Sequence, residues 1–136
     1  MTTITRFEEI EAWKTARELT NMIYSMTDKG LIARDFGLRD QIRRAAVSVM
    51  SNIAEGFESQ TSAQFIRYLS IAKASAGEVR SQLYVTKDLK TLSSEQFSNA
   101  FQLAEKASRQ ISRFITYLQK NSKSRPVRED GTEYEV

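Results

Sequence analysis

The sequence predicts an all-α protein, an antiparallel up-down-up-down four-helix bundle, and three observations support this. Apolar residues recur every three or four positions in four successive segments, as they do on one face of a helix. Helix-start signals stand at the breaks between these segments. Proline and glycine number only one and five, too few for a turn-rich β protein.

The four periodic segments define four helices in order along the chain. Their apolar stripes run from Ile10 to Met26, Leu38 to Ile53, Phe65 to Leu89 and Phe97 to Leu118. The last two helices should each contain roughly 27 residues, about 40 Å at 1.5 Å per residue. Short connections between long amphipathic helices favour antiparallel neighbours. Residues 1–121 are therefore expected to form the bundle domain, and residues 122–136, which lose the period, a disordered charged tail.

Capping residues mark the expected helix starts. Three hydroxyl residues, each followed three positions later by Glu or Gln, predict capping boxes: Thr5 with Glu8, Thr61 with Gln64, and Ser93 with Gln96. The carboxylate of Asp35 should cap the second helix. Gly30 and the pair Gly56-Phe57 are expected to close the first two segments.

Histidine and cysteine are both absent from the chain. Their absence excludes the usual zinc, iron–sulfur and di-iron sites, disulfides, cysteine nucleophiles and Ser–His pairs. We therefore expect a protein that is not an enzyme, with no catalytic residues, no metal and no cofactor. The N-terminal residues lack a signal-peptide core, and no run approaches the roughly 18 apolar residues that span a bilayer. A cytoplasmic protein with no membrane contact is expected.

The formal charge of +3 is unevenly distributed. Residues 122–136 hold three bases and four acids, which leaves +4 on residues 1–121, concentrated on the third and fourth helices. Lys73, Arg80 and Lys87 repeat every seven residues along one edge of the third helix. Arg109 and Arg113 belong to a similar stripe on the fourth. Antiparallel packing would join the two stripes into a basic band that attracts phosphate, although a solvated face is the simpler interpretation of so modest a charge.

A second basic cluster, Arg39, Arg43 and Arg44, lies near the start of the second helix. Three arginines favour bidentate recognition of phosphate or carboxylate. Pairing with Asp35 and Asp40 at helical spacing is the competing interpretation.

The second helix also carries a polar stripe among small residues. Ser48, Asn52 and Glu55 belong to it and are predicted to lie at a seam between helices or subunits, where Ser and Asn can hydrogen-bond across. A lone carboxylate such as Glu55 supplies no reaction. Gly77 lies in mid-helix, where glycine costs about 1 kcal/mol relative to alanine, and therefore indicates a close backbone approach at the same kind of seam. The tyrosines, including Tyr84, could stack nucleic-acid bases but are more often core or seam residues.

Three stretches of the sequence resemble a known family. They are QIRRAAVSVMSNIAEGF at 41–57, FEEIEAW at 7–13 and FIRYLSIA at 65–72. The chain resembles the bacterial four-helix-bundle family typified by 23S rRNA intervening-sequence proteins, distantly related to the accessory variability proteins of diversity-generating retroelements. The likeness covers roughly residues 5 to 120. Met50 departs from it, because the family usually has proline there.

The resemblance implies a homopentamer without catalytic residues. In the retroelement relatives, a positively charged pentamer engages nucleic acid and a reverse transcriptase. Five copies of a body charged +4 would carry about +20, enough to make phosphate binding plausible.

Two hypotheses about function follow. The first is a non-catalytic oligomeric bundle that binds structured RNA or another nucleic acid electrostatically, through phosphate contacts from eight residues: Arg39, Arg43, Arg44, Lys73, Arg80, Lys87, Arg109 and Arg113. The alternative is a protein-interaction scaffold or accessory subunit, for example of a reverse transcriptase, without direct nucleic-acid binding.

Overall fold

The computed structural model describes residues 3–121 and the backbone of residues 134–135. Its elements, in chain order, are β1 (Thr3–Ile4), the 3-10 turn η1 (Phe7–Glu9), α1 (Glu11–Met26), α2 (Leu31–Arg34), α3 (Phe36–Glu58), α4 (Ser62–Leu89), α5 (Ser94–Asn121) and β2 (Tyr134–Glu135).

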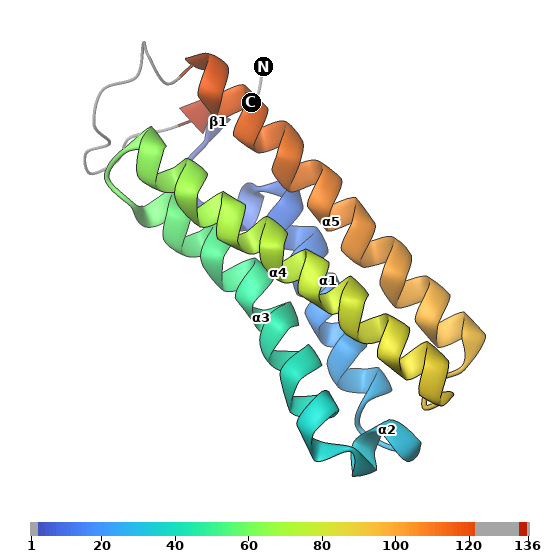
Figure 1. Ribbon diagram of the computed structural model, residues 1–136. Coiled ribbons are helices and arrows are strands. Elements are labelled where there is room, and N and C mark those ends of the chain that lie inside the picture. Colours follow the sequence, from blue (N-terminus) through green and yellow to red (C-terminus); the bar gives the residue numbers. More distant parts are fainter. Residues whose placement is uncertain (1–2, 122–133, 136) are drawn as a thin grey trace.

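The four long helices α1, α3, α4 and α5 form an up-and-down bundle (Figure 1). α1 packs against α3 and α5, and α4 packs against the same two helices, so each helix lies beside the one that precedes it among the four. α4 and α5 contain 28 residues each, close to the predicted length. The predicted all-α four-helix bundle is confirmed.

Side-chain caps begin three of the helices as predicted. The Asp35 carboxylate accepts a hydrogen bond from the Leu38 N–H at 3.2 Å, and Thr61 Oγ1 accepts one from the Gln64 N–H at 3.1 Å. Gln64 Oε1 accepts from the Gln60 N–H at 3.0 Å rather than from that of Thr61, so this capping box forms only in part. At the start of α5 the exchange is reciprocal. The Gln96 N–H donates to Ser93 Oγ, and the Ser93 N–H donates to Gln96 Oε1, both at 3.0 Å. These local contacts satisfy backbone donors that a helix start leaves unpaired.

The predicted capping box of Thr5 and Glu8 is wrong. The Thr5 N–H donates to Glu9 Oε1 at 2.8 Å, which lowers the pKa of the Glu9 carboxyl, whereas Glu8 pairs with Arg6 at 3.1 Å. α1 begins only at Glu11, after Ile10, which supplies no side-chain cap. Ile10 is only 1% exposed, so burial of this apolar side chain in the core, rather than a polar cap, anchors the start of α1.

Gly56 and Phe57 lie in the last turn of α3, which ends at Glu58, so the segment closes where it was predicted to close. Both residues are buried. A Cβ on Gly56 would lie 2.7 Å from Phe65 Cδ1 and 2.9 Å from Tyr68 Cβ. Glycine at this position therefore serves the close packing of α3 on α4. Gly30 does stand in the break after α1, with a φ of 82° that favours glycine. The one-turn helix α2 that follows it was not predicted.

The core consists of two apolar clusters along the bundle. One lies near the end where β1 and the last turn of α5 meet, and its largest members are aromatic. The Phe65 ring makes edge-on contacts with Phe57 and Phe114, at centroid distances of 6.2 and 5.2 Å. The other cluster, nearer α2, is aliphatic and includes Leu19 and Leu83. Together they hold α4 and α5 side by side along their length.

Most of the predicted tail lies outside the described residues. Of its residues, only Tyr134 and Glu135 are assigned, and their backbone pairs antiparallel with Ile4 and Thr3. Within residues 3–121, no helix combines the length and apolar character needed to cross a membrane.

Candidate nucleic-acid interface

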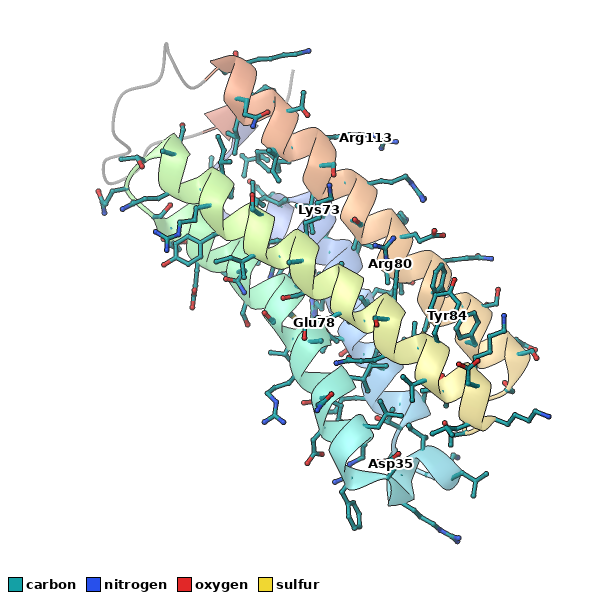
Figure 2. All side chains as sticks on the ribbon, viewed as in Figure 1. Asp35, Lys73, Glu78, Arg80, Tyr84 and Arg113 are labelled. Carbon is teal, nitrogen blue, oxygen red and sulfur yellow. The ribbon has the colours of Figure 1, made fainter. Side chains whose placement is uncertain are left out.

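A shallow groove of about 520 Å³ separates α4 from α5 and is lined mainly by cations. α4 contributes Lys73 and Arg80, and α5 contributes Arg109 and Arg113. Figure 2 shows Lys73 and Arg80 on the side of α4 that faces α5, with Arg113 extending from α5. We call this feature the α4–α5 groove. It unites two basic stripes that lie far apart in the sequence.

Helix periodicity explains why these four side chains meet. Lys73 and Arg80 are seven residues apart, and Arg109 and Arg113 four apart, so each pair lies on one face of its helix. On both helices, the basic residues lie directly beside buried positions. Ala72 and Val79 precede the bases of α4 in the core, and Ser108 precedes Arg109. The same packing that buries these neighbours directs the bases to the edges of the α4–α5 contact.

The bases of the groove form no ion pair with a carboxylate in the described residues. The ion pairs formed by residues 3–121 are Arg6–Glu8, Lys14–Glu11 and Arg39–Asp40, and none involves a base of the groove. Glu105 lines the groove without reaching ion-pair distance. Neighbouring like charges repel, so this arrangement favours an anionic ligand.

Arg80 is the most enclosed cation of the groove. Its side chain is half-buried, and its Nε–H is buried without a hydrogen-bond acceptor in the described part of the chain. The guanidinium folds back along α4, so that Nη2 would lie 3.7 Å from a Cβ on Gly77. A buried donor without an acceptor costs free energy.

Lys87 continues the α4 stripe but lies outside the groove. It lines a separate hollow of about 700 Å³ at the α4–α5 turn, with Lys90 and Phe97. Its Nζ sits 5.0 Å from the centroid of the Phe97 ring, a cation–π contact. Lys87 therefore extends the basic surface toward the end of the bundle.

Arg39 and Arg43, two members of the predicted second cluster, have partners within the chain. Arg39 pairs with Asp40 and donates to the Ala33 carbonyl at 3.2 Å. Arg43 Nε donates to Thr27 Oγ1 at 2.8 Å, and the guanidinium lies 4.5 Å from the centroid of the Tyr24 ring. These contacts tie α3 to the end of α1 and to α2.

Arg44 points elsewhere. It lines a hollow of about 290 Å³ between α3 and α4, together with Ser48 and Glu78. Figure 2 shows Glu78 on the side of α4 away from Arg80. The structure thus brings together four of the eight predicted residues and distributes the other four over three places.

Ser48 and Asn52 occupy the seam between α3 and α4. Ser48 Oγ and Ser75 Oγ lie 2.9 Å apart across it, and Asn52 Nδ2 donates to Ser48 Oγ at 3.0 Å. Glu55 is exposed. Gly77 has no atom of another helix within 4 Å of its Cβ position, so the close approach is absent within the chain, and its place at a subunit seam stays a prediction.

Sequence reasoning missed the serine that precedes each of the two arginines of α5. Ser108 and Ser112 line the groove beside Arg109 and Arg113. The signal was present as a repeated Ser-Arg dipeptide four residues apart, which places two hydroxyls and two guanidinium groups along neighbouring lines of one helix.

Residues 3–121 thus form an antiparallel helical bundle with a cationic groove between its last two helices. Residues 3–121 hold no group of three or more acidic side chains placed to bind a metal ion. The chain belongs to the 23S rRNA-intervening sequence protein family, whose model matches residues 8–113. This confirms the resemblance noted from the sequence.

A solved structure supports the fold. A protein of unknown function from the S23 ribosomal protein family of Bacteroides thetaiotaomicron is 22% identical and superposes with a TM-score of 0.66. The match covers 77% of this chain and 91% of that protein. No curated protein matches the chain.

Proposed function

We propose that this protein is a non-catalytic helical bundle that binds structured RNA or another nucleic acid through the α4–α5 groove. The observation that carries the proposal is the convergence of Lys73, Arg80, Arg109 and Arg113 in one groove, with no carboxylate at ion-pair distance in the described residues. A polyanion is the ligand that such a surface complements best.

The four bases suit contacts to phosphate rather than to base edges. Three of them are exposed and carried by long side chains, and they follow the groove instead of surrounding a closed pocket. Contacts of this kind position a nucleic acid but do not read its sequence. Binding should therefore be strong at low salt and only weakly dependent on sequence.

We further propose that the protein acts as a homo-oligomer, the state that the family resemblance implies. Each additional copy adds one groove to the assembly. Linked sites bind a long polyanion with far higher avidity than one site, provided that the ligand can reach several grooves at once. Oligomerisation would thus compensate for the modest charge of a single chain.

The experiment compares two double variants that remove equal charge. Arg109→Gln/Arg113→Gln neutralises the groove at two exposed positions, and Lys29→Gln/Arg34→Gln neutralises two exposed positions at the α1–α2 corner. Affinity for a fluorescent RNA stem-loop is measured by anisotropy at about 50 mM salt, where phosphate contacts contribute strongly. We expect the groove variant to lose at least tenfold, about 1.4 kcal/mol, and the control much less.

Equal losses in the two variants would overturn the assignment to the groove. No binding by the wild-type protein would overturn the function itself. In that case, a stable complex with another protein that survives nuclease treatment would support the accessory-subunit alternative.

A further inference from the structure

An aromatic cluster lies on the same face of the bundle as the α4–α5 groove. Tyr84 of α4 contacts Phe97 and Phe101 of α5, with ring centroids 5.6 and 5.3 Å apart. The rings of Phe97 and Phe101 stack on each other at 5.3 Å. We call these three residues the aromatic cluster.

The cluster directly continues the groove toward the end of the bundle. Tyr84 follows Arg80 by four residues, and Phe101 precedes Glu105 by four, so each lies one helical turn from a residue of the groove. Figure 2 shows Tyr84 and Arg80 on the same side of α4. Beyond the cluster, Lys87 lies over the Phe97 ring. Cations therefore flank the aromatic rings on both sides.

Tyr84 is held firmly yet remains open to solvent. It is 50% exposed, whereas Phe97 and Phe101 are half-buried beneath and beside it. Its ring meets them at interplanar angles of 57° and 74°, so the contacts are tilted or edge-on rather than stacked. These contacts hold the ring against α5, and its exposed half offers surface on which a flat ligand can stack.

The exposed ring of Tyr84 differs from the exposed aromatic rings at the α2 end of the bundle. Arg43 lies 4.5 Å from the centroid of Tyr24, and Arg39 lies 4.9 Å from that of Phe36, so each of those rings has a guanidinium partner from its own chain. No cation–π contact is formed by Tyr84 within the described residues. The nearest cations along α4, Arg80 and Lys87, instead extend a surface suited to phosphate.

We propose that Tyr84 stacks on an unpaired base while the α4–α5 groove binds the flanking phosphates, so that the site prefers single-stranded RNA to a duplex. This inference rests on the proposed function. Aromatic platforms beside a cationic groove are the combination by which proteins hold single strands, because every base has a π face that a duplex keeps stacked internally. In a structured RNA, the recognised element would be a loop or an overhang.

The test uses a labelled single-stranded RNA of about 12 nucleotides, within the usual range of site sizes, and a duplex of the same sequence. Tyr84→Ala should weaken single-strand binding about 5- to 150-fold, the range for one lost stacking contact, and leave duplex binding unchanged. Tyr84→Phe should bind like the wild type. Tyr84→Leu, which keeps apolar contact with Phe97 and Phe101, should bind like Tyr84→Ala if the aromatic ring is what matters.

The outcomes separate this inference from the proposed function. Equal affinity for single strand and duplex, with Tyr84→Leu binding as the wild type does, would overturn the stacking site. The proposed function would still stand if the wild type bound RNA and Arg109→Gln/Arg113→Gln lost that binding. A change in molecular mass of the assembly with Tyr84→Leu, at unchanged affinity, would show that the cluster contacts another protein copy and would also overturn it. No binding of either RNA would overturn both proposals.

Discussion

Two helical glycines illustrate how differently single residues act in this bundle. Gly56 is buried in α3 against Phe65 and the Cβ of Tyr68, whereas Gly77 in α4 faces only the end of the Arg80 side chain. The first glycine permits α3 and α4 to approach. The second weakens its helix without a packing role that is visible within one chain.

We therefore expect opposite effects from the same substitution. Gly56→Ala should lower the free energy of unfolding by about 1–3 kcal/mol, because neither a buried ring nor a helix can move aside cheaply. Gly77→Ala should raise it by roughly 0.5–1 kcal/mol, because alanine favours the helix and its Cβ meets Arg80 Nη2 at an ordinary 3.7 Å. Urea denaturation measures both. Loss of stability and of assembly mass in Gly77→Ala would instead place Gly77 in a subunit seam.

Arg43 is expected to matter for stability rather than for RNA binding. Its Nε–H donates to Thr27 Oγ1, a buried hydroxyl that in turn donates to the Ile23 carbonyl at 2.7 Å. Arg43→Ala should therefore cost about 1–2 kcal/mol, since it removes a charged donor from a buried acceptor. Arg44→Ala, at the adjacent exposed position, should stay within about 0.5 kcal/mol of the wild type. Thermal unfolding compares the two, and equal stability would contradict the role assigned to Arg43.

At the scale of the helix, the starts that depend on capping hydrogen bonds could be predicted from the sequence. The start that depends on burial of a side chain in the core could not. The capping box of α5 involves only Ser93 and Gln96, which are three positions apart, so the sequence alone predicts it. The start of α1 depends instead on the burial of Ile10 in the core. Tertiary packing decides this start, and a local motif does not contain it.

The side-chain cap of α5 should consequently contribute more to the free energy of unfolding than the contacts around Thr5. Ser93→Ala removes an acceptor for the Gln96 N–H and should cost about 1 kcal/mol, as such caps usually do. Thr5→Ala keeps the backbone N–H that donates to Glu9 and should cost less than about 0.5 kcal/mol. Chemical denaturation of the two variants tests the comparison, and an equal cost would restore Thr5 as a cap.

Helical periodicity predicted the part of the candidate site that depends on residue spacing along one helix. The seven-residue spacing of Lys73 and Arg80 and the four-residue spacing of Arg109 and Arg113 predicted two stripes, and antiparallel packing joins them. Periodicity alone did not show that Arg43 finds its partner Thr27 across the α1–α3 contact. Nor did it separate Tyr84 from the buried aromatics, because exposure depends on all neighbouring helices.

At the scale of the whole molecule, the placement of charge carries more information than its sum. A formal +3 over 136 residues is unremarkable, yet four bases line one groove and Lys87 extends the same side of α4. Arg39 and Arg43 serve the α2 end of the bundle instead. One face is thus suited to a polyanion, and repeated copies of it in an assembly would multiply that effect.

The salt dependence of RNA binding tests the central claim most directly. If the four groove bases each neutralise one phosphate, log K should fall with log salt with a slope of about −3 to −4 for each engaged chain. The slope for Arg109→Gln/Arg113→Gln should be shallower by about 1.4–1.8, and that for Lys29→Gln/Arg34→Gln nearly unchanged. A slope near zero, or one that the groove variant shares with the wild type, would contradict the account.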